Sequence, residues 1–230
     1  MRCMNDSFLK AQIRAMPDTD WVIAIACLAA ILYIISRLMF PRYHSRISHA
    51  FFNRYEAAKL IEEKIVLFNR GGYLLNLIPP FCIALIVVEQ IGYIHPEFIL
   101  LDPFPNYLKV LAITFLYFVG RILAIYLFGY AFEQKEVALR FNQVWLLQFE
   151  NLSSFILVPS VILPFTSGVV KLILLIAIWF VLLLWLIYTC IRELELLKSY
   201  RVSIFYMFLY LCTLEILPLW WVMQSITEGW

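Results

Sequence analysis

Apolar residues occupy six long continuous runs of the chain, separated by shorter polar segments. A hydrocarbon core about 30 Å thick is crossed by roughly 20 helical residues, because each residue advances the helix by about 1.5 Å. We therefore predict six membrane-spanning helices, at residues 21–40, 72–93, 109–128, 142–163, 169–191 and 202–222. Strands of a membrane barrel would instead alternate apolar and polar positions. The expected fold class is all-α, a polytopic helix bundle that forms a single membrane domain over residues 1–230.

The fourth run is the weakest of the six predictions of a membrane span, because amide, carboxyl and hydroxyl side chains interrupt it. Several runs also contain proline, which lacks a backbone N–H and displaces a helical hydrogen bond. We expect these residues to bend their helices: Pro79, Pro80, Pro159, Pro164 and Pro218.

The segment between the first two runs has the pattern of an amphipathic helix at about residues 48–68. Its apolar positions recur at spacings of three and four: Phe51, Tyr55, Ala58, Ile61, Ile65 and Phe68. Such spacing places them on one helical face. Ser48 is a suitable N-cap, and Gly71 with Gly72 a suitable stop. The helix either covers the inner face of the bundle or offers the surface from Phe51 to Phe68 to a membrane or cytoplasmic protein partner.

The positive charges predict the orientation of the bundle. Most of the 18 Lys and Arg residues lie in the loops after the first, third and fifth runs. Cytoplasmic loops carry such an excess, so these three loops are expected in the cytoplasm. Both termini are then expected in the periplasm.

Three ionisable residues, Arg121, Glu150 and Glu215, lie inside predicted spans. Such residues are costly in lipid, roughly 2.5 to 3.5 kcal/mol on insertion scales, and they are the default pointers to function. Helical rise places Glu150 nearer than Glu215 to the level of Arg121. We predict an intramembrane polar cluster in which Arg121 pairs with Glu150, with Glu215, Gln148 and Asn151 nearby. The cluster is either structural, holding the helices in register, or functional, as a proton or ion relay or an anionic headgroup site.

Composition narrows the class of function. The sequence is 63% apolar and 15% charged, with a net charge of +2, which excludes an ordinary cytosolic enzyme and gives no reason to expect a nucleic-acid partner. No nucleotide-binding, hydrolase or metalloprotease motif occurs. His44 and His49 have a poor metal-binding spacing, and the five cysteines are scattered. We therefore expect no catalytic site, no metal site and no cofactor.

Three parts of the sequence resemble a known family: the segment DWVIAIACLAAILYIISRLMFPRYHSRISHAFFN, the closing stretch LKSYRVSIFYMFLYLCTLEILPL and the polar fourth run. They are similar to an uncharacterised family of Bacteroidetes inner-membrane proteins, catalogued as a domain of unknown function. The most specific part is the last run, with Tyr200, Arg201, Tyr210, Leu214, Glu215 and Pro218. The resemblance implies a multi-pass protein of the bacterial inner membrane, and it supplies no activity.

Two hypotheses of function follow. The first is a non-catalytic assembly or interaction component of the cell envelope, surrounded by the lipid bilayer. The second is a small transporter or lipid-handling protein that uses the intramembrane Arg/Glu cluster. A proline three residues after Glu215 is also found in cation-binding broken helices, although many kinked spans bind nothing.

Overall fold

The computed structural model describes residues 20–53, 55, 59, 71–94, 103–131 and 133–200. This part of the chain is all-helical and contains no strand, which confirms the predicted fold class. Its elements are α2 (Asp20–Met39), α3 (Pro41–Phe52), α5 (Gly71–Ile94), α6 (Pro103–Ala131), α7 (Lys135–Ile162), the 3₁₀ helix η2 (Leu163–Phe165) and α8 (Gly168–Ser199).

Five of these helices, α2, α5, α6, α7 and α8, are long and apolar enough to cross a membrane. They correspond to the first five predicted spans, and most are longer than predicted. Helix α7 begins at Lys135 rather than at residue 142, and α8 continues to Ser199 rather than ending at 191. The predicted sixth span, at residues 202–222, lies outside the described residues.

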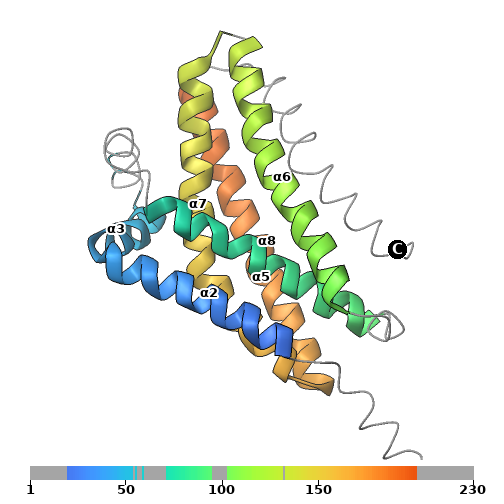
Figure 1. Ribbon diagram of the computed structural model, residues 1–230. Helices are drawn as coiled ribbons and strands as arrows, with labels where there is room; N and C mark the ends of the chain where they lie inside the picture. The colour runs from blue at the N-terminus through green and yellow to red at the C-terminus, as the bar shows by residue number, and fades with distance from the viewer. Residues whose placement is uncertain are drawn as a thin grey trace, which may run out of the picture.

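Helix α7 lies at the centre of the described bundle. Helices α6, α7 and α8 run alongside one another, whereas α2 and α5 cross them obliquely (Figure 1). Helix α7 contacts α2, α3, α5, α6 and α8, and its closest packing is with α5. In the most apolar windows of α5 and α7, 61% of the residues are buried, against 11% in α6 and α8. The outer helices therefore shield the two inner ones.

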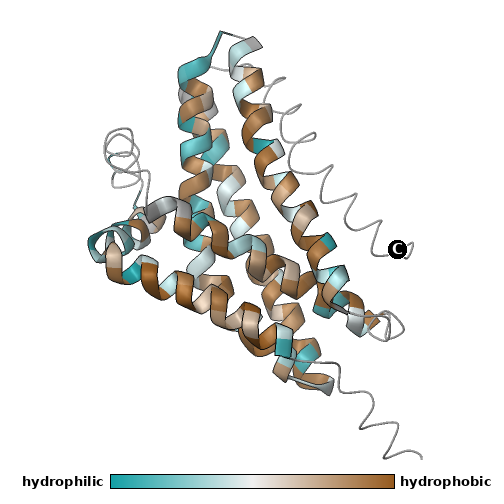
Figure 2. Ribbon diagram, in the orientation of Figure 1, coloured by the Kyte–Doolittle hydropathy of each residue, from teal (hydrophilic) through white to brown (hydrophobic). Residues whose placement is uncertain are grey.

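The outer helices turn apolar side chains to the surroundings. Leu116 of α6 is 74% exposed, and Ile176 of α8 is 60% exposed. Figure 2 shows hydrophobic residues along most of α2, α6 and α8, with hydrophilic residues concentrated on α3 and toward one end of α7. An exposed surface of this kind is costly in water and suits a lipid environment. The protein thus has the features of an integral membrane protein.

The interface between α5 and α7 is built from helical spacing on both sides. On α5, Leu75, Ile78, Cys82 and Ile86 recur at intervals of three and four and are all buried. They belong to the same core cluster as Leu152 and Ile156 of α7. Residues at this spacing share one face of a helix, so α5 presents a continuous apolar stripe to α7.

A tight hairpin joins α6 to α7. The backbone N–H of Gln134 donates to the carbonyl of Gly129 at 2.8 Å, and that of Glu133 donates to the carbonyl of Tyr130 at 3.3 Å. With Glu133 at a φ of 56°, this is the Schellman pattern that ends many helices. Gly129 also packs directly against α7, because a Cβ added there would lie 2.3 Å from the Cβ of Ala138.

Helix α3 overlaps only the first part of the amphipathic helix predicted at residues 48–68, and most of the rest of that prediction lies outside the described residues. Pro41 starts α3, because the fixed φ of proline suits the first helical turn. The chain leaves the helix at Asn53, whose backbone is extended. Ser48 is therefore inside α3 and is not its N-cap; its hydroxyl donates to backbone carbonyls one turn earlier. Of residues 54–70 the structure describes only 55 and 59, and Tyr55 is 73% exposed.

The predicted proline positions have different outcomes. Pro79 and Pro80 lie inside α5, and Pro159 lies inside α7, so both helices continue through them. Pro164 is not inside α7: it belongs to η2, where the chain leaves α7 and turns toward α8. Pro218 lies outside the described residues.

Candidate functional site

Polar side chains concentrate on the inner surfaces of α7. Those of Asn142, Gln148, Glu150, Asn151, Ser153 and Ser160 are all buried. A polar group buried among apolar side chains is costly unless it is hydrogen-bonded, and hydrocarbon offers no partners. These polar residues interrupt the fourth apolar run. The central position of α7 explains them, because the neighbouring helices supply contacts for their side chains.

The carboxylate of Glu150 connects three helices. The hydroxyl of Tyr43, on α3, donates to Oε2 of Glu150. Nδ2 of Asn76, on α5, donates to Oε1 at 3.2 Å. Only 1% of Glu150 is exposed. Burial, and then the nearby carboxylate of Glu150, raise the pKa of Tyr43 far above its usual value. The phenol therefore keeps its proton and remains a donor at physiological pH.

A second set of contacts on α3 surrounds His44. Nε2 of the imidazole lies 3.3 Å from Oγ of Ser36, which is buried on α2. The ring also makes an edge contact with Tyr33. Burial, and then the positive charge of Arg37, lower the pKa of His44 below its usual value. His44 is consequently neutral near pH 7.

Helix α3 is attached to the bundle at its other end as well. The hydroxyl of Tyr188, on α8, donates to the backbone carbonyl of Phe51. The Arg192 guanidinium donates to the same carbonyl at 3.3 Å and to the Tyr188 hydroxyl at 2.8 Å. Cationic donors favour the C-terminal end of a helix, where carbonyls lack partners within the helix. Contacts at both ends therefore hold α3 against α7 and α8.

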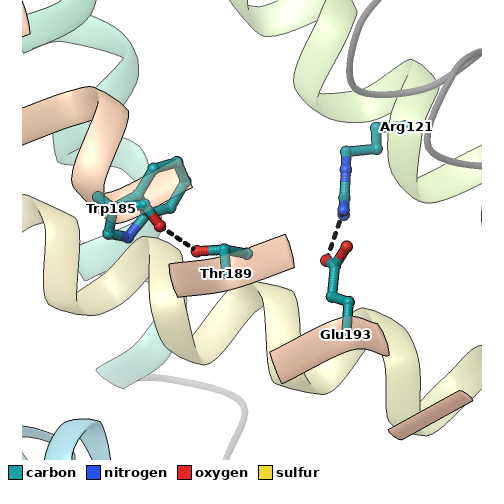
Figure 3. Close-up of polar contacts among 4 residues, drawn as sticks. All are labelled: Arg121, Trp185, Thr189 and Glu193. Carbon is teal, nitrogen blue, oxygen red and sulfur yellow. Dashed lines mark hydrogen bonds and ion pairs between the residues drawn. The ribbon is translucent and has the colours of Figure 1, made fainter. Parts of the chain in front are cut away.

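Arg121, on α6, forms an ion pair with Glu193, on α8. Their Nη2 and Oε1 atoms are 2.7 Å apart, and both side chains are almost completely buried. Figure 3 shows the Arg121 guanidinium directed at the Glu193 carboxylate, with Thr189 and Trp185 on the preceding turns of α8. The guanidinium carbon also lies 4.2 Å from the centre of the Trp145 ring, a cation–π contact with α7.

The prediction paired Arg121 with Glu150, whereas the structure places the Glu193 carboxylate against the Arg121 guanidinium. Glu150 is five residues beyond Trp145 on α7, an axial distance of about 7.5 Å at 1.5 Å per residue. Aromatic rings fill this interval. Trp145 stacks on Phe149 with centroids 4.9 Å apart, and Phe118 contacts both.

The other residues of the predicted cluster are also distributed differently. Nδ2 of Asn151 donates to the carbonyl of Leu147 within α7. Gln148 is 1% exposed, and its backbone carbonyl accepts a hydrogen bond from Nε1 of Trp185 at 3.0 Å. Glu215 lies outside the described residues. The contacts described for Arg121, Gln148, Glu150 and Asn151 thus go to different partners along α7.

A second ion pair, which sequence analysis missed, lies between α5 and α8. Nζ of Lys171 is 2.5 Å from Oε2 of Glu89. One residue along α5, Oε1 of Gln90 accepts a hydrogen bond of 2.6 Å from Nε1 of Trp179. Glu89 could have been singled out, because it falls inside the predicted span at 72–93. Glu193 gave a weaker signal, because it follows the predicted end of its span at 191.

Two kinds of feature in the described ranges bear on possible chemistry: metal-binding clusters and cavities. Within residues 20–53, 71–94, 103–131 and 133–200, no three His, Cys, Asp or Glu side chains gather closely enough to hold a metal ion. The concave feature beside Glu150 is a small cavity of about 60 Å³ between α3, α5 and α7. What the arrangement offers chemically is a buried carboxylate beside this cavity and ion pairs that join helices.

Comparison with known proteins gives a family and no activity. No curated protein and no solved structure matches the chain. One family does match, over residues 22–226 of the 230-residue sequence, so the match extends from α2 to beyond α8. The chain belongs to this family, which is described as a domain of unknown function, DUF4271.

Proposed function

We propose that this protein is a non-catalytic assembly or interaction component of a bacterial inner (cytoplasmic) membrane. The supporting observation is that ionic and polar contacts join its membrane-length helices to one another. Arg121 and Glu193 join α6 to α8, Lys171 and Glu89 join α8 to α5, and Glu150 joins α7 to α3 and α5. Contacts of this kind between spans fix the relative positions of helices.

The surface proposed for a partner is the outward side of α3 and the chain that follows it, in the region from Phe51 to Phe68. Tyr43, Ile47 and Ala50 pack inward, whereas Arg42 and His49 are exposed. Because both ends of α3 are attached to the bundle, the exposed side is held in a fixed orientation. Its basic character suits an acidic segment of a cytoplasmic protein.

The alternative function, a small transporter or lipid-handling protein, depended on a cluster of Arg121, Glu150 and Glu215. The described contacts of Arg121 go to Glu193 and those of Glu150 to Tyr43 and Asn76, which gives a shared ion pathway less support. We therefore favour the interaction component. In this proposal the loops after α2, α6 and α8 are cytoplasmic, and both termini are periplasmic.

The experiment is purification of the tagged protein from native membranes after mild cross-linking. We expect a stoichiometric partner protein with the wild-type chain. We expect it to be lost when Arg42 and His49 are both replaced by Glu, because these changes make the exposed side of α3 acidic. The matched control is Lys198→Glu, which reverses an exposed charge near the end of α8.

Retention of the same partner by the double variant would exclude α3 as the contact surface. Absence of any stoichiometric partner from the wild-type preparation would contradict the proposed function itself. Size-exclusion elution at the wild-type volume shows that each variant is folded.

A further inference from the structure

The corner between α2 and α3 combines exposed arginine and exposed apolar side chains. Arg37 lies in the last turn of α2, Arg42 lies in the first turn of α3, and both are exposed. Leu38 and Met39, the last two residues of α2, lie between them in the sequence and are 75% and 64% exposed. Apolar side chains left this open are costly in water. A ligand that covers the whole corner therefore needs an apolar part as well as a negative charge.

The last turn of α2 packs on the first turn of α3. Oγ of Ser36 lies 3.3 Å from Nε2 of His44, and Phe40 is the single residue between the two helices. Burial lowers the pKa of His44, and the positive charge of Arg37 lowers it further, so Arg37 lies close to α3. Arg37 follows Ser36 directly, and Arg42 is two residues before His44. Both arginines therefore belong to the same corner of the molecule.

The exposed side of this corner is basic. Asp20, at the opposite end of α2, is the only acidic residue of α2 and α3. Among the residues that the structure describes, neither the Arg37 nor the Arg42 guanidinium forms an ion pair. The Glu150 carboxylate lies on the buried side of α3, where Tyr43 donates to it. Clustered positive charges without acidic neighbours attract anions.

The length of α2 places this corner at the surface of the membrane. Its 20 residues extend about 30 Å, which is the thickness of the hydrocarbon core. Because Arg37 is two residues from the end of α2, its long side chain reaches the level of the lipid phosphates. Leu38 and Met39 then lie at the boundary between headgroups and acyl chains. On the side predicted to be cytoplasmic, anionic headgroups attract basic residues of the protein.

We propose that the corner between α2 and α3 binds an anionic phospholipid, with Arg37 and Arg42 at its phosphate and with Leu38 and Met39 against its acyl chains. A guanidinium group donates two parallel hydrogen bonds to phosphate oxygens. Phosphatidylglycerol suits two arginines better than phosphatidylethanolamine does, because the ammonium of phosphatidylethanolamine cancels the charge of its phosphate. The lipid site shares Arg42 with the surface proposed for a protein partner, whereas Arg37, Leu38 and Met39 lie outside that surface.

The test uses the full chain, purified in detergent and depleted of lipid. Phosphatidylglycerol and phosphatidylethanolamine of identical acyl chains are added in equal amounts, and the retained lipid is measured by native mass spectrometry. We expect a preference on the order of tenfold for phosphatidylglycerol, because each basic residue near a headgroup strengthens binding of a net negative lipid. Equal retention of the two lipids would overturn the proposal.

Two variants address the site itself. Arg37→Gln and Arg42→Gln each remove one charge from an exposed position, and each should lower the preference about fivefold. The double variant should lose the preference; if it elutes at the wild-type volume and keeps it, the proposal is contradicted. Lys109→Gln removes an exposed charge near the start of α6, on the side predicted to be periplasmic, and should keep the preference. Arg37→Gln should also leave copurification of the protein partner unchanged, so the lipid site and the proposed function can fail separately.

Two competitors distinguish the lipid from other anions. Glycerol 3-phosphate supplies a phosphate without acyl chains, and a soluble polyglutamate peptide supplies carboxylates. Each is added to the complex with phosphatidylglycerol, and sodium chloride at equal ionic strength is the control. We expect neither competitor to displace more lipid than sodium chloride does, because neither packs against Leu38 and Met39. Greater displacement by glycerol 3-phosphate would assign the arginines to a soluble phosphate, and greater displacement by the peptide would assign them to an acidic protein; either result overturns the proposal.

Discussion

Arg121 shows how much of the environment of an ionisable residue can be predicted from its position in a span. Its burial and its need for a carboxylate partner follow from the cost of charge in lipid. The identity of the partner depends on how far α8 extends. Glu193 continues the inward face formed by Ile178, the partly buried Trp185 and Thr189, at spacings of seven, four and four. The apolar run ended before Glu193, so hydropathy alone did not include it, whereas extending the helical periodicity would have done so.

Replacing Arg121 with Leu should lower the stability of the protein, because Glu193 would be left as a buried charge. Breaking one side of a buried pair costs about 3 kcal/mol or more. Thermal unfolding in detergent micelles measures the loss. The double variant with Glu193→Leu should recover most of it, since two apolar residues replace the pair. Lys109→Leu, at an exposed position of the same helix, is the control and should change stability little.

Equal unfolding temperatures for Arg121→Leu and Lys109→Leu would show that the ion pair contributes nothing to the fold. Failure of the double variant to recover stability would point instead to the cation–π contact with Trp145 as the main contribution.

His44 should make the stability of the protein depend on pH in the weakly acidic range. Its pKa in the folded protein is lowered by burial and by Arg37, whereas the unfolded chain has the ordinary value of about 6.5. Above that pH both states are neutral at this position, and His44 has no effect on stability. As the pH falls below about 6.5, the unfolded chain binds the proton first, so stability decreases.

The measurement is the unfolding temperature in detergent between pH 7.5 and pH 5, for the wild type and for His44→Gln. We expect a smaller decrease in His44→Gln, because the titrating group is absent. His49→Gln, on the exposed side of the same helix, should keep the wild-type decrease. Identical curves for all three proteins would contradict the assignment.

At the scale of the helices, the sequence predicts the five described spans well, because continuous hydrophobicity reports passage through lipid. It does not show which helix lies at the centre of the bundle. Helix α7 is the least apolar of the five and is the least certain span by hydropathy, yet it contacts α2, α3, α5, α6 and α8. Polar residues lower the hydropathy of a span in the same way whether they are exposed or internally paired. Only the arrangement of the neighbouring helices distinguishes the two cases.

Helix α3 illustrates a different limit of prediction. Apolar spacing from Phe51 to Phe68 predicted one amphipathic face, most of which lies outside the described residues, and it did not include the side of α3 that packs on the bundle, formed by Tyr43, Ile47 and Ala50. Tyrosine and alanine carry weak hydrophobic signals, so Ile47 was the one strongly apolar residue of this face and no apolar pattern stood out. The contact of Tyr43 with Glu150 depends on tertiary structure and has no local sequence pattern.

Gly129 should be the position in the α6–α7 hairpin that is least tolerant of a larger side chain. A Cβ there would lie 2.3 Å from that of Ala138, so Gly129→Ala forces the helices apart. We expect a loss of about 1 to 3 kcal/mol of unfolding free energy, as for other overpacked contacts. Gly120→Ala, on the same helix with no atom within 4 Å, is the control and should gain up to about 1 kcal/mol from helix propensity.

Unfolding in a graded mixture of detergents, monitored by tryptophan fluorescence, compares the two variants directly. The prediction concerns the order of stability, with Gly120→Ala above the wild type and Gly129→Ala below it. The reverse order would mean that α6 and α7 do not approach closely at this end.

For the whole molecule, charge and hydropathy predict a bundle with alternating sides, and the described helices provide sites at which to test it. Gln134, in the α6–α7 hairpin, and Ser167, between η2 and α8, are exposed near opposite ends of α7. In a cysteine-free background, a single cysteine at position 134 should resist a membrane-impermeant maleimide in spheroplasts, since that hairpin is predicted to be cytoplasmic. A cysteine at position 167 should react. Labelling in the opposite order would invert the orientation.

The unequal lengths of the packed helices have a consequence for the surrounding lipid. Helix α2 has 20 residues and α6 has 29, or about 30 Å and about 44 Å at the usual rise. A uniform slab of hydrocarbon accommodates both only if their axes are inclined to one another, as Figure 1 shows them to be. Because tilt is the way in which a long span adjusts to the hydrocarbon thickness, a change in acyl-chain length is expected to change the crossing angles of the helices. The thickness of the surrounding bilayer would thereby influence how the helices are arranged.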